Sequence, residues 1–440
     1  MTNVADATPA SGEVQPPART SLRSLLAQTE IDLRLFGMLL ALAVILLTFN
    51  VLSDGKFFRP TNMVTLAVQA TGVAIIATGM VMVIVSRNID LSVGSLVGLI
   101  AMSYALLMTD WMPHLLGMGP DFPFRWVIAL GLGLALGAAV GALQGFIIAY
   151  VGVPSFIVTL GGLLSIRGAV WYLSSGAAVS GLDSSFQLIG GGAEGSIGGA
   201  ATWILGILAC VPIVALLVTG RRQRRHYGFP VRPIWAEAML GVIGCGAVVG
   251  LAAFANANLW PKGLAARYAA EHGLSIPAGG VQIPTGFPYP IILLIGVTLV
   301  MTWMATRRRF GRYVYAYGGN PEAAELGGIN TRWTILKIYA LMGVLCALAA
   351  AIASARLNGS TLDVGQGYEL YVIAAAVVGG TSFAGGIGTI PGAVLGAFVM
   401  QSLAYGLSFM GVNAPGQNVV AGIVLIVAVG FDSYNRRRGS

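Results

Sequence analysis

The chain has 440 residues, of which 56% are hydrophobic and only 10% are charged, and its mean hydropathy is +0.81. A soluble domain needs far more charge to cover its surface, so this composition excludes a soluble protein and indicates a polytopic membrane protein. The net charge of +8 does not indicate nucleic-acid binding, because the arginine runs are short, lie beside apolar segments and lack an aromatic platform.

The two ends of the chain differ from the rest in composition. Residues 1–32 are rich in Thr, Pro, Ser, Glu and Gln and contain no apolar run, so we expect a disordered cytoplasmic tail and not a signal peptide. Residues 33–434 are expected to form one transmembrane domain, and residues 435–440 a short cytoplasmic tail.

About 20 apolar residues are needed for a helix to cross a hydrocarbon core of about 30 Å. On this criterion the sequence predicts an all-α fold with about twelve transmembrane helices. Glycine and polar residues interrupt the second, third, tenth and eleventh of these segments, so some are expected to be broken or re-entrant. The predicted spans are residues 35–53, 62–85, 91–109, 126–150, 154–174, 201–219, 234–255, 289–306, 332–355, 369–387, 390–409 and 418–432.

The basic residues set the predicted orientation. Fifteen of the 25 Lys and Arg residues fall on one side of the membrane if there are twelve spans. Cytoplasmic loops carry an excess of Lys and Arg, so this side and both termini are predicted to be cytoplasmic, where contact with anionic lipid headgroups follows. These residues are Arg19, Arg23, Arg34, Arg221, Arg222, Arg224, Arg225, Arg232, Arg307, Arg308, Arg309, Arg312, Arg436, Arg437 and Arg438.

A polar break separates the second and third predicted spans. It contains Arg87, Asn88, Asp90 and Ser92. Charges near a span are costly in lipid and are usually paired or functional. We favour a structural role, in which Asp90 and Ser92 cap the next helix and Arg87 pairs with Asp90. Direct contact with a transported solute is compatible with this role, because broken helices line transport pathways.

The middle of the chain holds one further intramembrane charge and two long external loops. Arg167 lies within the fifth predicted span and is expected to have an acidic or carbonyl partner. Residues 176–199, rich in Gly and Ser, and residues 257–289 are predicted external loops. The first of these is a plausible docking surface for a soluble partner. The spans 201–219 and 234–255 between these loops are predicted to be peripheral.

No catalytic or metal-binding pattern is present. The three cysteines lie far apart in apolar runs, and the three histidines lie in loops without a second ligand at useful spacing, so no metal is assigned. The sequence also lacks a phosphate-binding loop and any readable nucleophile–base set. We therefore expect neither an enzyme nor a bound cofactor.

A short helix is predicted within the loop 307–332. Asn320 can cap free N–H groups, Pro321 fits the first helical position, and Glu322 suits the positive end of the helix dipole. Gly327 and Gly328 then end the helix. A helix of residues 321–326 is too short to be stable alone, so it must pack against its own bundle or against a partner.

The last third repeats a spacing seen earlier. Gly94 and Gly98 share a Gly-x3-Gly-x3-Met pattern with Gly392 and Gly396, and each pattern follows a polar or glycine-containing break. The repeat is either chance or an internal duplication, and in both cases it provides a close-contact helix face.

Three stretches carry a resemblance to a known family. Glu322-Ala323-Ala324 followed by Gly327, behind the basic run 307–312, resembles the cytoplasmic coupling segment of bacterial ABC sugar-importer permeases of the ribose, xylose, arabinose and galactose type. The stretches Gly79–Leu99 and Ala374–Phe398 resemble the same family, and the likeness covers most of residues 35–434. The extra segment 202–289 is similar to the longer, xylose-type members.

The resemblance implies a permease subunit of an ATP-driven importer of a monosaccharide, with xylose favoured, in the bacterial inner membrane. It implies a ten-helix core plus an inserted pair, a homodimer with a central pathway, a separate ATP-binding subunit that binds the ATP, and a periplasmic sugar-binding protein. The implied coupling residues are Asn320, Pro321, Glu322, Ala323, Ala324, Glu325, Leu326 and Gly327. Candidate pathway residues are Asn88, Asp90, Ser92, Gly94, Gly98, Thr381, Ser382, Gly392 and Gly396.

Within the short helix, Ala323 and Leu326 are the expected apolar contacts of the ATP-binding subunit, with Glu322 and Glu325 available to pair with its basic groups. The alternative function is a secondary carrier driven by an ion gradient. Its candidate coupling residues, Asp90, Lys337 and Glu369, all lie near predicted span ends, where capping or snorkelling also explains them.

Overall fold

The computed structural model describes residues 33–119, 122–273 and 280–439, and the predicted tail 1–32 lies outside this range. Almost all of the described chain is helical. The first half contains α2 (Leu33–Leu52), α3 (Pro60–Val85), α4 (Val93–Leu106) continued by η1 (Leu107–Trp111) and α5 (Met112–Leu116), α6 (Arg125–Phe146) continued by η2 (Ile147–Val151), α7 (Ser155–Ser174), β1 (Val179–Ser180), α8 (Ser184–Gln187), η3 (Leu188–Gly190) and α9 (Gly199–His226).

The second half contains α10 (Ile234–Asn256), α11 (Lys262–Glu271), α12 (Tyr289–Arg307), α13 (Arg309–Gly319), α14 (Pro321–Leu326), α15 (Thr331–Leu357), β2 (Gly359–Ser360), α16 (Tyr368–Val378), α17 (Ile390–Phe409) and α18 (Ala414–Gly439). The two short strands pair antiparallel, with Val179 opposite Ser360. α18 continues through most of the predicted tail 435–440.

The all-α polytopic fold is confirmed. Ten helices of the described residues are long and apolar enough to cross a membrane, and two shorter apolar helices, Tyr368–Val378 and Ala414–Val427, accompany them. The predicted span 369–387 is wrong in length, because α16 ends at Val378. Gly380 then takes a φ of +91°, which turns the chain out of the helix.

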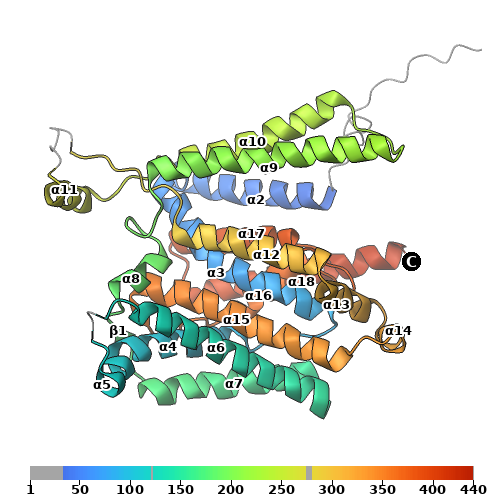
Figure 1. Ribbon diagram of the computed structural model, residues 1–440, viewed down its shortest axis with the longest axis horizontal. Helices are drawn as coiled ribbons and strands as arrows, with labels where there is room; N and C mark the ends of the chain where they lie inside the picture. The colour runs from blue at the N-terminus through green and yellow to red at the C-terminus, as the bar shows by residue number, and fades with distance from the viewer. Residues whose placement is uncertain (1–32, 120–121, 274–279, 440) are drawn as a thin grey trace, which may run out of the picture.

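The buried core consists of α3, α4, α15 and α16, with α6 and α17 packed on it (Figure 1). α3 is buried along nearly its whole length, because its many small residues allow neighbouring helices to approach closely. α6 and α15 approach each other very closely. There a Cβ atom on Gly343 would overlap the carbonyl oxygen of Gly137.

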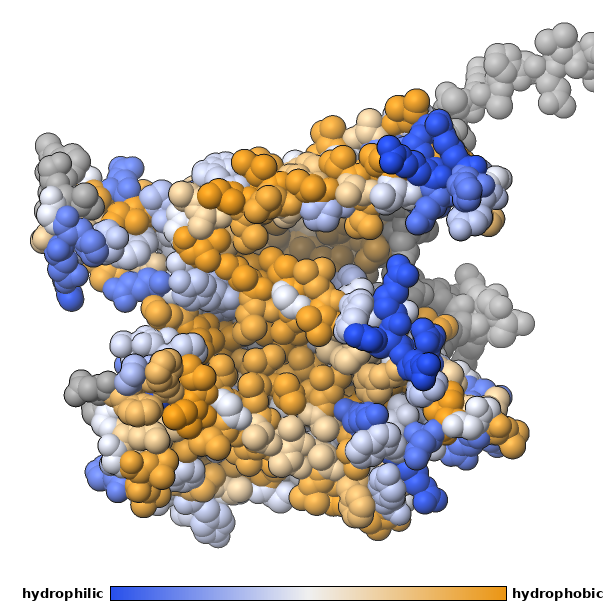
Figure 2. Space-filling view, in the orientation of Figure 1, coloured by the Kyte–Doolittle hydropathy of each residue, from blue (hydrophilic) through white to orange (hydrophobic). Residues whose placement is uncertain are grey.

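α2, α9 and α10 form a layer at the edge of this core (Figure 1). α2 packs on α17 through an aromatic cluster in which the rings of Phe49 and Tyr405 both lie within 6 Å of Phe57, centroid to centroid. The inserted pair α9 and α10 packs chiefly on itself. Figure 2 shows a wide apolar belt across these helices and the core, as expected for surfaces that face lipid.

The structure places the predicted cytoplasmic segments at one end of the molecule. The start of α2, the turn between α9 and α10, the helices α13 and α14, and the end of α18 share this end (Figure 1). α5, α8, α11 and the β1–β2 pair lie at the other end. The two basic clusters in Figure 2 lie at the end that carries α14, in agreement with the predicted orientation.

Candidate functional site

The predicted short helix is present as α14, with the predicted bounds. The Asn320 side chain accepts a hydrogen bond from the Ala323 N–H at 3.0 Å, and Pro321 occupies the first helical position. The helix ends where the Ile329 N–H bonds back to the Ala324 carbonyl, with Gly328 at a φ of +79°. Local capping at both ends therefore makes this six-residue helix possible.

One face of α14 packs on the bundle and the opposite face is open. Ala324 is buried, whereas Ala323 and Glu322 are exposed and the Leu326 side chain is 91% exposed. Glu325 is engaged within the chain, because its Oε1 accepts a 2.8 Å hydrogen bond from the Thr331 hydroxyl at the start of α15. Packing of this helix on its own bundle is thus confirmed for Ala324, whereas contact of Leu326 with a partner stays a prediction.

The helix preceding α14 was not predicted. α13 is strongly amphipathic, with Gly311, Val314 and Gly318 buried against the bundle. The spacing of Phe310, Val314 and Tyr317 at i, i+4 and i+7 is the signal that identifies it, but the flanking arginines give this stretch the composition of a loop.

The end of α13 joins the two broken regions of the core. Arg87 donates from Nε to the Gly318 carbonyl at 2.7 Å and from Nη2 to the Gly319 carbonyl at 2.8 Å. The Gly386 N–H donates to the Val85 carbonyl at 3.0 Å. We call this meeting of residues 85–87, 318–319 and 385–388 the cytoplasmic junction. All three stretches that carry the family resemblance contribute to it.

Two tyrosines of α13 support the junction. The Tyr315 hydroxyl donates to the Gly388 carbonyl at 2.8 Å. Burial raises the pKa of Tyr317 above its ordinary value near 10, the negative charge of Glu325 raises it further, and the positive charge of Arg87 lowers it. Tyr317 is therefore neutral at physiological pH, and it lies within the electrostatic range of both α14 and the junction.

The predicted Arg87–Asp90 pair is wrong, because backbone carbonyls of α13 bind the Arg87 guanidinium instead. Asp90 Oδ1 accepts from the Ser92 N–H at 2.9 Å and from the Ser92 hydroxyl at 2.7 Å, and Ser92 Oγ also lies 3.0 Å from Gln144 Oε1. Asn88 donates to the Ser86 carbonyl at 2.9 Å. These polar side chains therefore satisfy one another and the backbone at the break before α4.

The four repeated glycines lie at two different helix contacts. A Cβ on Gly94 or Gly98 would overlap the carbonyl of Gly365 or Val364, in the irregular segment before α16. These glycines thus form close-contact faces, as predicted. On α17, a Cβ on Gly392 or Gly396 would overlap the carbonyl of Gly379 or Ala375 at the end of α16.

The irregular segment before α16 also receives the intramembrane arginine. Arg167 Nη1 donates to the Leu362 carbonyl at 2.9 Å and to the Val364 carbonyl at 3.2 Å, so the expected carbonyl partners are confirmed. α4 and α16 are therefore both preceded by irregular backbone, and Gly94 and Gly365 bring these two helix starts together. Discontinuous helices of this kind line transport pathways.

Two candidate pathway residues occupy the turn after α16. The Ser382 hydroxyl accepts from the Ala384 N–H at 3.1 Å. The Thr381 hydroxyl is buried and has no hydrogen-bond partner among the described residues. A buried hydroxyl without a partner is costly, which distinguishes Thr381 from the other polar groups of this turn.

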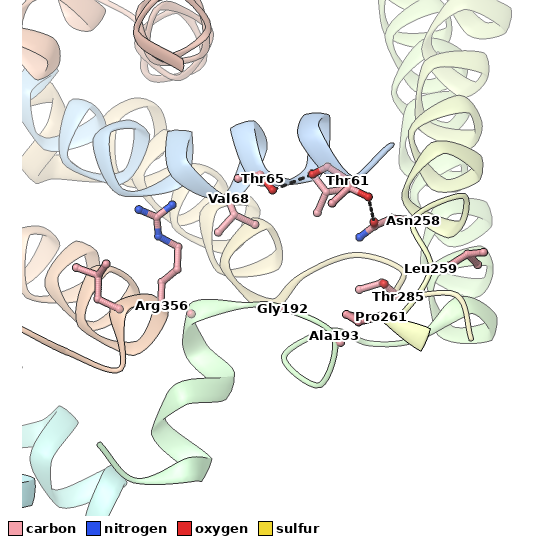
Figure 3. Close-up of a pocket in the computed structure, with 13 residues that line it drawn as sticks. Thr61, Thr65, Val68, Gly192, Ala193, Asn258, Leu259, Pro261, Thr285 and Arg356 are labelled. Carbon is pink, nitrogen blue, oxygen red and sulfur yellow. Dashed lines mark hydrogen bonds between the residues drawn. The ribbon is translucent and has the colours of Figure 1, made fainter. Parts of the chain in front are cut away.

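At the opposite end, a cavity of about 470 Å³ opens between the start of α3, the η3 loop, the end of α15 and the inserted segment (Figure 3). Its polar groups include Thr61, Asn258 and Arg356. Thr61 Oγ1 donates to Asn258 Oδ1 at 3.1 Å. Sequence reasoning missed this site, because its residues lie far apart in the chain, although Arg356 in the last turn of a span is a usable signal.

The inserted segment 202–289 contributes residues to this external cavity, although its two helices α9 and α10 are peripheral. Asn258, Leu259, Pro261 and Thr285 form one wall of the external cavity (Figure 3). Among the described residues, no group of three or more His, Cys, Asp or Glu side chains is placed to hold a metal ion. The polar lining of this cavity combines one cation, Arg356, with the neutral hydrogen-bonding groups of Thr61 and Asn258.

Comparison with protein families decides the identity. Residues 62–429 match the family described as "Branched-chain amino acid transport system / permease component". This chain belongs to that family. As a member it is a multi-pass permease and a transport component, and the match covers every segment of the cytoplasmic junction.

Curated relatives of this permease have similar lengths. The chain is 36% identical over 411 residues to the xylose transport system permease protein XylH of Escherichia coli (strain K12), covering 93% of this chain and 94% of that protein. XylH of Haemophilus influenzae is 34% identical, at 93% and 98% coverage. The ribose import permease protein RbsC of Escherichia coli (strain K12) is 30% identical, at 90% and 92%. No solved structure matches this chain.

The cytoplasmic junction gives a first testable result. Replacing Arg87 by Gln is expected to lower transport by this permease about tenfold, because a hydrogen bond from a charged donor contributes about 1.5 kcal/mol or more. The amount of inserted protein should not change, since Arg87 is exposed at the junction. Arg332→Gln, an exposed arginine in the first turn of α15, is the matched control. Equal transport by both variants would contradict a role for the Arg87 link.

Proposed function

We propose that this chain is the membrane-spanning permease subunit of an ATP-driven importer of a monosaccharide in the bacterial inner membrane, with xylose as its sugar. The observation that carries the proposal is the 36% identity over 93% of the chain to a xylose transport system permease protein. The family description names branched-chain amino acids. The sugar is favoured because relatives that cover nearly the whole chain are named as sugar permeases.

In this proposal a sugar-binding protein docks at the external end and releases the sugar near the external cavity, which is lined by Thr61 and Arg356. Its volume of about 470 Å³ lies within the range of small-molecule sites, and its Thr, Asn and Arg side chains supply donors and acceptors for sugar hydroxyls. The wall contributed by the inserted segment supports a role for that segment in docking or sugar selection.

At the cytoplasmic end a separate ATP-binding subunit contacts α14. The open Leu326 and Ala323 face supports this assignment, with Glu322 beside it to pair with a basic group. When the ATP-binding subunits close, α14 moves and α13 passes the displacement through the cytoplasmic junction to the breaks before α4 and after α16. Coupling is mechanical, and the permease itself binds no ATP.

The pathway is proposed to lie beside the two broken regions and to be completed by a second copy of the chain. Asn88, Asp90, Ser92, Thr381 and Ser382 are its proposed polar residues, with Thr381 the strongest because its hydroxyl has no partner among the described residues. The glycines at 94, 98, 392 and 396 have a supporting role, since they allow the flanking helices to pack closely.

Transport in proteoliposomes tests the proposal. The permease is reconstituted with the ATP-binding subunit and the sugar-binding protein encoded beside it. Uptake of radiolabelled xylose is expected to require ATP on the side of the membrane where α14 lies. It should continue when a protonophore removes the proton gradient, and it should be faster than uptake of ribose. Uptake that is lost with the protonophore and needs no ATP would establish the ion-driven carrier instead. Asp90→Asn would then be the variant that identifies its coupling group.

A further inference from the structure

A basic cavity lies at the cytoplasmic end of α12, separate from α14 and from the junction. It has a volume of about 740 Å³ and lies between the last turn of α12, the first turn of α13 and the α15 segment from Lys337 to Leu341. Its cationic residues come from all three helices. They are Arg307, Arg308, Arg309, Arg312 and Lys337.

These five cations have no counter-charge within the described chain. No Asp or Glu lines the cavity, and none of the five forms an ion pair among the described residues. The other basic cluster at this end differs, because Arg221 pairs with Glu237 at 2.6 Å. Five like charges around one cavity repel each other, so a bound anion would lower the energy of the site.

The remaining lining of the cavity is aromatic and apolar. The Arg308 guanidinium lies 3.9 Å from the centre of the Trp303 ring, which belongs to this lining. Lys337 Nζ lies 4.9 Å from the centre of the ring of Trp333, one turn before it on α15. Tryptophans of this kind mark the membrane–water interface. Met304, Phe310 and Leu341 complete the apolar part of the lining.

The cavity lies at the depth in the membrane where lipid headgroups are found. Lys337 is six residues beyond the start of α15, which corresponds to about 9 Å along the helix, and Leu341 is about one turn deeper. The cavity therefore reaches from the cytoplasmic surface to the edge of the apolar belt. Figure 2 shows this basic cluster directly beside that belt.

An exposed apolar stripe leads from the cavity into the membrane. Ile295, Leu299 and Trp303 are spaced at i, i+4 and i+8 on α12 and are 49%, 66% and 47% exposed. An acyl chain can lie along this stripe while its phosphate occupies the basic cavity. A soluble phosphate would use the cations but would leave the stripe unused.

We propose that this cavity binds the phosphate group of an anionic lipid of the cytoplasmic leaflet. Arginine forks bind phosphate oxygens through paired hydrogen bonds, and Lys337 adds a charge at the hydrocarbon boundary. Basic pockets between transmembrane helices on the cytoplasmic side are suited to such headgroups. The bound lipid fixes α12, α13 and α15 relative to one another, next to the segment that moves during coupling.

Native mass spectrometry of the purified full chain tests the proposal, with phosphatidylglycerol and phosphatidylcholine added in equal amounts. The wild type is expected to retain phosphatidylglycerol preferentially. Arg308→Gln combined with Lys337→Gln should weaken its retention about tenfold or more, since two cations near the headgroup are removed. Arg222→Gln combined with Arg225→Gln removes the same charge from exposed positions at the same end and should change retention less than about twofold.

Further measurements separate the possible ligands. The charge-preserving pair Arg308→Lys and Lys337→Arg should keep the lipid, which a folding defect would not. No preference for phosphatidylglycerol in the wild type, or equal losses in the cavity and control variants, would overturn the proposal. Inorganic phosphate or glycerol phosphate binding as tightly as the lipid would assign the site to a soluble phosphate. The Arg308→Gln, Lys337→Gln variant is also tested for co-purification with the ATP-binding subunit. If it loses that subunit but retains phosphatidylglycerol like the wild type, the cavity is a protein contact and the lipid proposal is overturned.

Discussion

Leu326→Asp is expected to reduce ATP-dependent uptake to background while the permease still folds and inserts. The Leu326 side chain is 91% exposed on α14, so no contact within the chain is lost and the free energy of unfolding should change by less than about 0.5 kcal/mol. At the proposed interface the same change would bury a carboxylate without a partner, which costs several kcal/mol and is enough to release the ATP-binding subunit.

Co-purification of the ATP-binding subunit and xylose uptake in proteoliposomes measure this effect. Val151→Asp is the matched control, because Val151 is 64% exposed at the tip of the α6–α7 hairpin at the same end of the molecule. The control should bind the subunit and transport normally. Normal transport by Leu326→Asp would show that α14 does not dock the ATP-binding subunit through this face.

Gly343→Val is expected to prevent the permease from accumulating in folded form. A side chain at this position would overlap the backbone of Gly137 on α6, and backbone atoms cannot move aside as the end of a flexible side chain can. The α6–α15 contact would have to open along its length, so we expect a loss of about 4 kcal/mol or more in the free energy of unfolding.

Fluorescence-detected size-exclusion chromatography of detergent extracts measures this loss, because the monodisperse peak should shrink or disappear. Heating the extracts before chromatography gives the melting temperature, which should be lower than that of the wild type. Gly296→Val on α12 is the control, because Gly296 has no atom of another residue within 4 Å of the added Cβ. It should behave like the wild type. A monodisperse Gly343→Val variant with an unchanged melting temperature would mean that α6 and α15 do not pack as closely as described.

Local rules explain what could be predicted from the sequence. Hydrophobic length located the apolar helices, and capping chemistry located α14 to the residue, because Asn320, Pro321 and Gly327 act within one turn of their own positions. Arginine distribution predicted which segments share one end of the molecule. Each of these signals depends on residues close together in the chain.

The remaining features depend on contacts between distant residues. The Arg87 guanidinium bonds to carbonyls 231 and 232 residues away, and backbone carbonyls leave no trace in a sequence. Asp90 was predicted as the partner of Arg87 because it is the nearest acid in the sequence. In the structure Asp90 instead accepts hydrogen bonds from the backbone N–H and the hydroxyl of Ser92. α13 was missed because its exposed arginines hide the apolar spacing, and the external cavity because it joins four separate segments.

The cytoplasmic junction has a consequence for the timing of the transport cycle. Arg87, Gly386 and the last residues of α13 are held together by direct hydrogen bonds, so the break before α4 and the break after α16 share one attachment point. In the proposed mechanism, a displacement of α14 therefore reaches both breaks at once. The two broken regions of one subunit should then move together, and intermediates in which only one of them is displaced should not accumulate.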